Sequence, residues 1–231
     1  MVSVVAFDGD DTLWHNESIF TMTQGRYRAL LERYLDGPAL DERLQANELR
    51  NLHLFGYGIK GFTLSMIETA IEASAGQVEA ATIQSIIEYG KAMLQHPVEL
   101  LEGVRATIEA LHGRYRLMVI TKGDLFDQES KLARSGLVEL FWQIEIVSEK
   151  DQETYRRILR AHHIDPREFV MVGNSIKSDI LPVLGLGAHA VHVPYHTTWI
   201  HERAELDEAS RKQVCTLVSL AELTEVLAAL L

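Results

Sequence analysis

Apolar residues follow two patterns along this chain: short unbroken runs and longer stretches with helical spacing. The short runs are rich in Val, Ile and Leu and predict buried strands at 2–7, 117–120, 144–147, 169–172 and 188–193. Stretches with helical spacing lie at 103–112, 125–135, 154–163 and 176–184. Strands that alternate with helices predict βαβ units, and therefore a parallel sheet with helices on both faces.

The segment from His15 to Pro97 departs from this alternation because it contains no strand-like run. Its pattern predicts four helices, at 20–35, 41–55, 62–75 and 78–94. A segment of this length is too long to be a single connection between a strand and the next element. We therefore predict an all-helical domain, 15–97, inserted after the first strand of a core domain that comprises 1–14 and 98–231.

Polar residues follow each of the first four predicted strands. The four loops are Asp8-Gly9-Asp10-Asp11-Thr12, Thr121-Lys122-Gly123-Asp124, Ser148-Glu149-Lys150-Asp151 and the stretch from Gly173 to Asp179. The carboxyl ends of parallel strands share one edge of a sheet, so these loops are expected to converge. Carboxylates, a hydroxyl group, a lysine and a Gly/Ser turn at one site suit phosphoryl transfer.

Charge and composition narrow the classes of partner. The 231 residues carry a net charge of −11, and no run of Lys and Arg occurs. Nucleic acids and anionic membranes require a basic surface, so we expect neither as a partner, whereas a local pocket could still bind a small anion. The chain shows neither a leader nor an apolar run of membrane-spanning length, and its one cysteine, Cys215, is expected to be buried. These features favour a cytoplasmic protein.

The four loops resemble the four motifs of the haloacid dehalogenase (HAD) superfamily. "FDGDDTLW" resembles that family's Asp-x-Asp-x-Thr motif, with Asp8, Asp10 and Thr12 in place. Thr121 matches the second motif, Lys150 fits the third, and "GNSIKSD" resembles the fourth with Asp179 as its acidic residue. The resemblance implies an α/β fold with a Rossmann-like parallel sheet core. It also implies that the helical insert is a C1-type cap.

The resemblance implies a role for each matching residue. Asp8 would be the nucleophile that forms an aspartyl phosphate, and Asp10 the general acid and base. Thr121 and the backbone amides of Lys122 and Gly123 would bind the phosphoryl oxygens. Lys150 would offset the phosphoryl charge and orient Asp8, although Lys122 could instead supply this cation.

A metal ion is implied as well. A carboxylate is a weak nucleophile toward a phosphate dianion, so the charge between them has to be neutralised. Mg²⁺ prefers hard oxygen ligands, and we expect it to bind the Asp8 carboxylate, the Asp10 backbone carbonyl and Asp179. Asn174 stands where the family commonly has Asp. It keeps an oxygen ligand but loses a charge, which predicts a weaker contact with the metal.

Other polar residues have structural interpretations beside functional ones. Asp11 is expected to cap a turn or to face solvent, and Asp124 to cap the helix at 125–135. In the insert, Tyr57 and Lys60 lie in a Gly-rich loop that either contacts substrate or is a plain turn. The segment 195–202, "YHTTWIHE", is expected to close one side of the site. The apolar stretch 217–230 predicts an exposed helix that packs on the core or on a partner, as in a monomer or a homodimer.

The leading hypothesis is a Mg²⁺-dependent phosphatase that acts on a small phosphorylated metabolite. A 2-haloacid dehalogenase is an alternative, but it needs neither a metal nor an acid two residues after the nucleophile, so Asp10 argues against it. A phosphonatase needs a cap lysine as Schiff base, for which Lys60 is the candidate, and a phosphomutase shares the core residues. A non-catalytic small-molecule binding protein would not need Asp8, Asp10, Thr121 and Asp179 together at strand ends.

Overall fold

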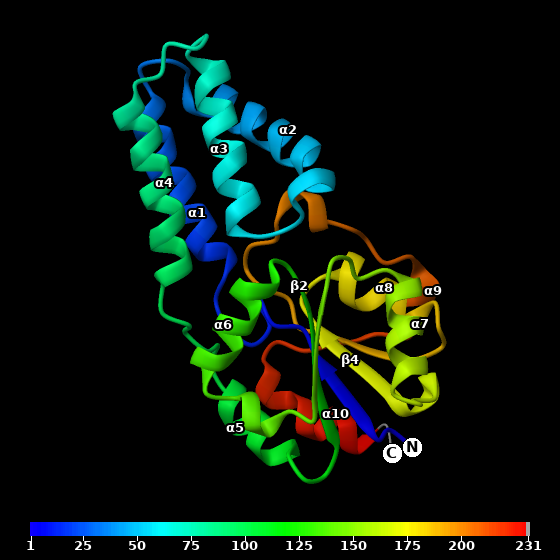
Figure 1. Ribbon diagram of the computed structural model, residues 1–231. Helices are drawn as coiled ribbons and strands as arrows, with labels where there is room; N and C mark the ends of the chain where they lie inside the picture. Colours follow the sequence, from blue (N-terminus) through cyan, green and yellow to red (C-terminus); the bar gives the residue numbers. More distant parts are fainter. Residues whose placement is uncertain (230–231) are drawn as a thin grey trace. The chain divides into compact units, whose positions relative to one another are not determined.

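The computed structural model describes residues 1–229 (Figure 1) and divides into two compact units. Unit 1 comprises Met1–Glu17, Val98–Lys122 and the chain from Gln128 onward. Unit 2 comprises Ser18–Pro97 together with Gly123–Asp127. The short segment Gly123–Asp127 therefore clusters with unit 2, although the sequence analysis had placed it in the core domain.

Unit 1 is built on a six-stranded parallel sheet. The strands are β1 (Val4–Phe7), β2 (Arg116–Lys122), β3 (Gln143–Val147), β4 (Phe169–Gly173), β5 (His189–His192) and β6 (Cys215–Thr216), in the order β3-β2-β1-β4-β5-β6. The predicted parallel α/β fold is confirmed. β6 is not predicted by the sequence, because its two residues are too few to show a pattern. Cys215, expected to be buried, is partly exposed in this edge strand.

The strand order reverses direction at β1. From β1 the chain continues to β2 and β3 on one side, whereas β4, β5 and β6 follow on the other side. Ligands of open α/β sheets bind at the carboxyl ends of the strands, where the order switches. Asp8, the residue directly after β1, lies at this switch point.

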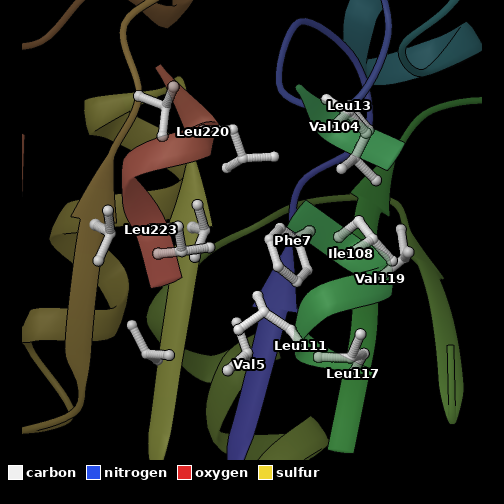
Figure 2. Close-up of a cluster of buried hydrophobic side chains, with 14 of the residues drawn as sticks. Val5, Phe7, Leu13, Val104, Ile108, Leu111, Leu117, Val119, Leu220 and Leu223 are labelled. Atoms are coloured by element: carbon white, nitrogen blue, oxygen red, sulfur yellow. The ribbon is translucent and has the colours of Figure 1, made fainter. Parts of the chain in front are cut away.

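Alternate residues of the strands face two different apolar layers. Val5 and Phe7 pack with α5 (Val104–Leu111) and α10 (Leu223–Ala229), as Figure 2 shows, whereas Val4 and Ala6 pack with α7 (Gln152–Ala161). Because both faces of the sheet are covered, the strands read as unbroken apolar runs rather than as alternating ones. These layers hold the strand ends, and therefore the loops that follow them, in fixed positions.

The helix predicted over 217–230 is shorter in the described residues and packs on the core, which is one of the two expected places, so it is not exposed. A short 3₁₀ turn, Leu220–Glu222, precedes α10, which begins only at Leu223, and position 230 lies outside the described residues. Leu223 and Leu227 are fully buried in the first apolar layer. Their spacing, one turn apart, is that of a helix packed on its own core.

The remaining helices of unit 1 include one irregular segment. The helix predicted at 176–184 is instead a π-helical turn, Ile176–Ile180, followed by α8 (Leu181–Leu184). The Ser175 hydroxyl accepts the Ser178 N–H at 3.1 Å and begins the turn. Single π turns are frequent at functional sites. The other short helix is α9 (Glu208–Arg211). In α6 (Leu125–Ser135), residues 125–127 cluster with unit 2 and residues 128–135 with unit 1.

Unit 2 contains four helices, as the sequence predicts: α1 (Glu17–Leu31), α2 (Gly37–Phe55), α3 (Ile59–Ala73) and α4 (Ala80–Gln95). They enclose an apolar core that includes Tyr27, Leu44 and Met66. α2 begins four residues earlier than expected because Asp36 accepts the Ala39 N–H at 3.0 Å and Pro38 occupies the first turn. None of the helices within residues 1–229 is long and apolar enough to cross a membrane.

Candidate active site

Asp8 is placed by the sheet itself. Its backbone N–H donates to the Val172 carbonyl at 2.9 Å and so continues the pairing of β1 with β4. Its side chain is buried. The next residue has to be Gly9, because a Cβ there would lie 2.8 Å from the Trp14 ring and 3.2 Å from the Thr121 hydroxyl oxygen. The loop after β1 and the end of β2 therefore approach each other closely.

Lys150 connects the carboxylates of two loops. Its ammonium group contacts the Asp8 carboxylate and lies 2.8 Å from an Asp179 oxygen, and its side chain is 1% exposed. The Lys122 ammonium, the alternative cation, instead pairs with Glu202 at 2.5 Å. Lys150 is therefore the lysine at the expected nucleophile.

Burial dominates the electrostatics of this group. It raises the pKa of the Asp8 carboxyl above its usual range, and the neighbouring Asp179 adds to this effect, whereas Lys150 counteracts it. Burial alone would lower the pKa of Lys150, but Asp179 and Asp8 together hold it above its ordinary value. Lys150 supplies a single positive charge to two carboxyl groups, so a further cation at this place would favour the ionised form of both.

The loop after β4 presents Asp179 and Asn174. The Ser175 N–H donates to Asp179 at 2.9 Å, and Asp179 is 1% exposed. A Cβ on Gly173 would lie 2.3 Å from an Asp179 oxygen, so only glycine leaves room for this carboxylate. The Thr12 hydroxyl lies 3.3 Å from an Asp8 oxygen and 3.4 Å from the Asn174 amide oxygen. Oxygens of both loops therefore gather next to Asp8.

The donor chemistry of these two loops fits Mg²⁺. Asp8 and Asp179 supply carboxylates, Asn174 supplies an amide oxygen and Asp10 supplies a backbone carbonyl, all of them hard oxygen ligands. The Lys150 ammonium group contacts both Asp8 and Asp179, so the two carboxylates are close enough to bind one cation together. Within residues 1–229, no group of three or more His, Cys, Asp or Glu side chains is arranged around a common metal position. A metal here would therefore rely on backbone and amide oxygens beside two carboxylates.

The carboxylate of Asp10 has three side-chain partners. It accepts from the Trp14 indole at 2.7 Å and from the Gln128 amide at 2.8 Å, and it pairs with Lys131 at 3.1 Å. Asp11 behaves differently from its neighbour. It is buried rather than solvent-facing, and it accepts the backbone N–H groups of Asn16 and Glu17, so it caps the start of α1.

The other expected site residues are placed as follows. Thr121, the penultimate residue of β2, is buried, and Lys122 and Gly123 follow it, the latter with φ +142°. In unit 2, Lys60 forms an ion pair with Asp124, at 2.8 and 3.0 Å from its two carboxylate oxygens. Asp124 also accepts the Asp127 N–H at 3.1 Å, which confirms it as the cap of α6. Tyr57 lies half-buried in the loop between α2 and α3.

Three residues at the site were not singled out from the sequence. Gln128 and Lys131 contact Asp10 from one face of α6, and Glu202 contacts Lys122. The spacing of Gln128 and Lys131, three residues apart on a helix that directly follows the second loop, is a weak signal for this placement. Glu202 is the last residue of the segment 195–202, which the sequence predicts to close one side of the site, but only the tertiary structure reveals its contact with Lys122.

Comparison with known proteins defines the family. A model of haloacid dehalogenase-like hydrolases matches residues 2–185, and the chain belongs to this family of hydrolases. It resembles the solved structure of a haloacid dehalogenase-like family hydrolase from Xanthomonas campestris with 43% identity and a TM-score of 0.89, covering 99% of this chain and 91% of that one.

Two similar relatives are named glyceraldehyde 3-phosphate phosphatase. The protein from Pyrococcus furiosus is 26% identical over 98% of this chain and 93% of its own. The protein from Pyrococcus abyssi is 23% identical over 84% of this chain and 82% of its own.

Proposed function

We propose that this hydrolase is a phosphatase that removes phosphate from a small phosphorylated metabolite through an aspartyl phosphate. The observation that carries the proposal is the arrangement at the switch point. Asp8 lies buried against Lys150, and a second acid, Asp10, follows two residues later. A dehalogenase has no use for this second acid because its leaving group is a halide ion, whereas an alcohol leaves a phosphate ester faster when an acid protonates it.

In the first proposed step, an Asp8 oxygen attacks phosphorus and the bond from phosphorus to the ester oxygen breaks. Asp10 first takes up a proton from solvent and then gives it to the departing alcohol. The Thr121 hydroxyl and the N–H groups of Lys122 and Gly123 donate to the phosphoryl oxygens, on which negative charge accumulates. Lys150 orients Asp8 and offsets part of that charge.

In the second step, water attacks the phosphorus of the aspartyl phosphate and Asp10 takes up a water proton. Inorganic phosphate leaves and the Asp8 carboxylate is regenerated. Before the reaction, the Asp10 carboxylate is held by Trp14, Gln128 and Lys131. Proton transfer therefore requires Asp10 to exchange at least one of these contacts for the substrate.

We propose Mg²⁺ as the cofactor, held by Asp8, Asp179, the Asp10 carbonyl and Asn174. When bound, it would neutralise charge between the nucleophile and the phosphate dianion. The support is the oxygen-rich donor set and the room that Gly173 leaves for Asp179. Because Asn174 carries no charge, we expect a lower Mg²⁺ affinity than a third carboxylate would give.

The two Pyrococcus relatives support a triose phosphate as the first substrate to assay, followed by other phosphorylated metabolites. Tyr57 and Lys60 remain candidates for substrate contact. The ion pair of Lys60 with Asp124 argues against Lys60 as the Schiff-base lysine of a phosphonatase, because a protonated, paired amine is not nucleophilic. Release of inorganic phosphate separates a phosphatase from a phosphomutase.

The Asp8→Asn variant tests this proposal. An amide is not a nucleophile toward phosphorus, so hydrolysis of p-nitrophenyl phosphate is expected to fall to the uncatalysed background. The matched control is Asp165→Asn, at an exposed surface position, and it should retain full activity. Retained turnover in Asp8→Asn, or release of chloride from 2-chloropropionate in the presence of EDTA, would contradict the proposal.

A further inference from the structure

The segment 195–202, which follows β5, forms hydrogen bonds with other parts of unit 1. The Tyr195 hydroxyl lies 2.7 Å from a ring nitrogen of His15, next to the loop that carries Asp8. The Lys177 ammonium donates to the His201 carbonyl at 2.7 Å. The segment ends in a 3₁₀ turn, Ile200–Glu202, whose last residue points back to the strand-end loops.

Glu202 joins two of these loops through its carboxylate. One oxygen pairs with Lys122, the last residue of β2, at 2.5 Å. The other accepts the Ser175 hydroxyl at 2.7 Å and also the Ser178 hydroxyl, both from the loop after β4. The side chains of Lys122 and Glu202 are only 14% and 11% exposed, so solvent screens the pair weakly.

Lys122, Ser175, Ser178 and Glu202 form a hydrogen-bonded network in which each group has a defined donor or acceptor role. The Ser178 hydroxyl accepts from Lys122 at 2.9 Å and donates to Glu202. The Ser175 hydroxyl accepts the Ser178 N–H and likewise donates to Glu202. Burial works toward a higher pKa for Glu202, but Lys122 and the two hydroxyls outweigh burial and hold that pKa below its usual range. Glu202 is therefore a charged acceptor for three donors.

The two serines adjoin the residues expected to bind metal. Ser175 follows Asn174, and its N–H holds Asp179, whereas Ser178 directly precedes Asp179 within the π-helical turn. Lys122 directly follows Thr121, and its pairing with Glu202 keeps its ammonium group on this network. We infer that Glu202 is a positioning residue that fixes the π-helical turn, and with it Asp179 and Asn174, in the geometry that a metal requires.

The effect of Glu202 on catalysis rests on the proposed function. Its effect on the order of residues 174–180 can be measured separately. In Glu202→Gln, an NH₂ group replaces one of the two acceptor oxygens. The side chain can then no longer accept from Lys122, Ser175 and Ser178 together. Loss of a hydrogen bond to a charged group is expected to speed amide exchange in 174–180 by about tenfold or more. Substituting a residue that holds metal ligands in place typically weakens metal binding about 10- to 100-fold. We therefore expect the Kd for Mg²⁺ to rise by about this factor.

The experiment compares wild type, Glu202→Gln and the control Glu205→Gln, an exposed glutamate three residues beyond the end of the segment. Hydrogen exchange is measured without metal, and Mg²⁺ binding by titration calorimetry. Activity is then followed as a function of Mg²⁺ concentration. We expect Glu202→Gln to need more Mg²⁺ for half-maximal activity yet to approach the wild-type kcat at saturation. A merely structural defect would lower the active fraction without moving that midpoint.

Should Glu202→Gln fail to fold, Ser178→Ala replaces it, because it removes one of the three donors and leaves the pair of Lys122 with Glu202 intact. Unchanged exchange in 174–180 together with an unchanged Kd for Mg²⁺ would overturn the inference. If wild type hydrolyses no phosphate ester but Glu202→Gln still loosens 174–180, then the proposed function fails and the positioning role stands. The two failures are therefore distinguishable.

Discussion

At the scale of single residues, the site depends on one buried lysine. Lys150 has both Asp8 and Asp179 as partners, and the side chains of these two acids are only 10% and 1% exposed. Removing one partner of a buried ion pair is costly because the remaining charges lose their compensation. The stability of unit 1 and the orientation of Asp8 are thus linked through the same ammonium group.

The Lys150→Met variant tests this link. Met keeps the length of the side chain but removes the charge, so in EDTA the free energy of unfolding should fall by about 3–5 kcal/mol. Mg²⁺ should restore part of the loss, because it would again supply a cation to Asp8 and Asp179. Urea unfolding measures both effects, with the exposed Lys212→Met as control. A variant as stable as wild type in EDTA would contradict this role of Lys150.

At the scale of elements, the apolar runs were sufficient to predict five strands, because a strand buried on both faces has no polar positions to interrupt it. The helix over 125–135 was predicted with its observed bounds. The start of α2 was not, because the cap Asp36 and Pro38 extend it beyond its apolar stripe. The π-helical turn at 176–180 was also missed, since helical spacing does not distinguish it from an α-helix.

In the candidate site too, the sequence predicts some features and not others. Asp8, Lys150 and Asp179 converge because each follows a strand of one parallel sheet, and the prediction of a parallel sheet is sufficient to expect this. The partners of Asp10 and the contacts of Glu202 depend on how α6 and the segment after β5 pack on the sheet. Packing between segments that are distant along the chain cannot be predicted from the local sequence. Motif spacing therefore predicts the reacting groups but not the side chains that hold them.

Helix α2 contains a buried acid that no motif explains. Glu48 faces the interior of unit 2, and within residues 1–229 its Oε2 atom has no hydrogen-bond partner. Its neighbours Asn47 and Asn51 in contrast bond to Thr69 and Ser65 of α3. Burial raises the pKa of Glu48 to about 7. The carboxyl group is therefore neutral in the folded protein at pH values where it is ionised in the unfolded chain.

This shift predicts a stability that depends on pH. Below the unfolded pKa of 4.5 the carboxyl group is protonated in both states, and its contribution is fully present. As pH rises through about 7, that contribution is lost, by up to roughly 3 kcal/mol. Glu48→Gln should remove this part of the pH dependence, whereas Glu42→Gln, exposed on the same helix, should keep it. Urea unfolding from pH 4 to pH 8 measures the slopes, and identical slopes in all three proteins would refute the prediction.

At the scale of the whole molecule, the two units have separate apolar cores, and the candidate metal ligands all belong to unit 1. A ligand that binds only the folded state stabilises it by mass action, by about 2.7 kcal/mol at a hundred times its Kd. Glu48 belongs to unit 2, whereas Asp8 and Asp179 belong to unit 1. Changes at sites without shared partners usually add independently.

The melting temperature should therefore rise with Mg²⁺ in wild type and equally in Glu48→Gln, by about 5–10 °C at a hundredfold excess over Kd. In Asp179→Asn the shift should largely disappear, because the metal loses one of its two carboxylates. Calorimetric scans at fixed pH, with EDTA as the metal-free reference, measure all three shifts. A full Mg²⁺ shift in Asp179→Asn would place the metal elsewhere in the molecule. A reduced shift in Glu48→Gln would contradict the expected additivity, because the substitution in unit 2 would then weaken Mg²⁺ binding at ligands in unit 1.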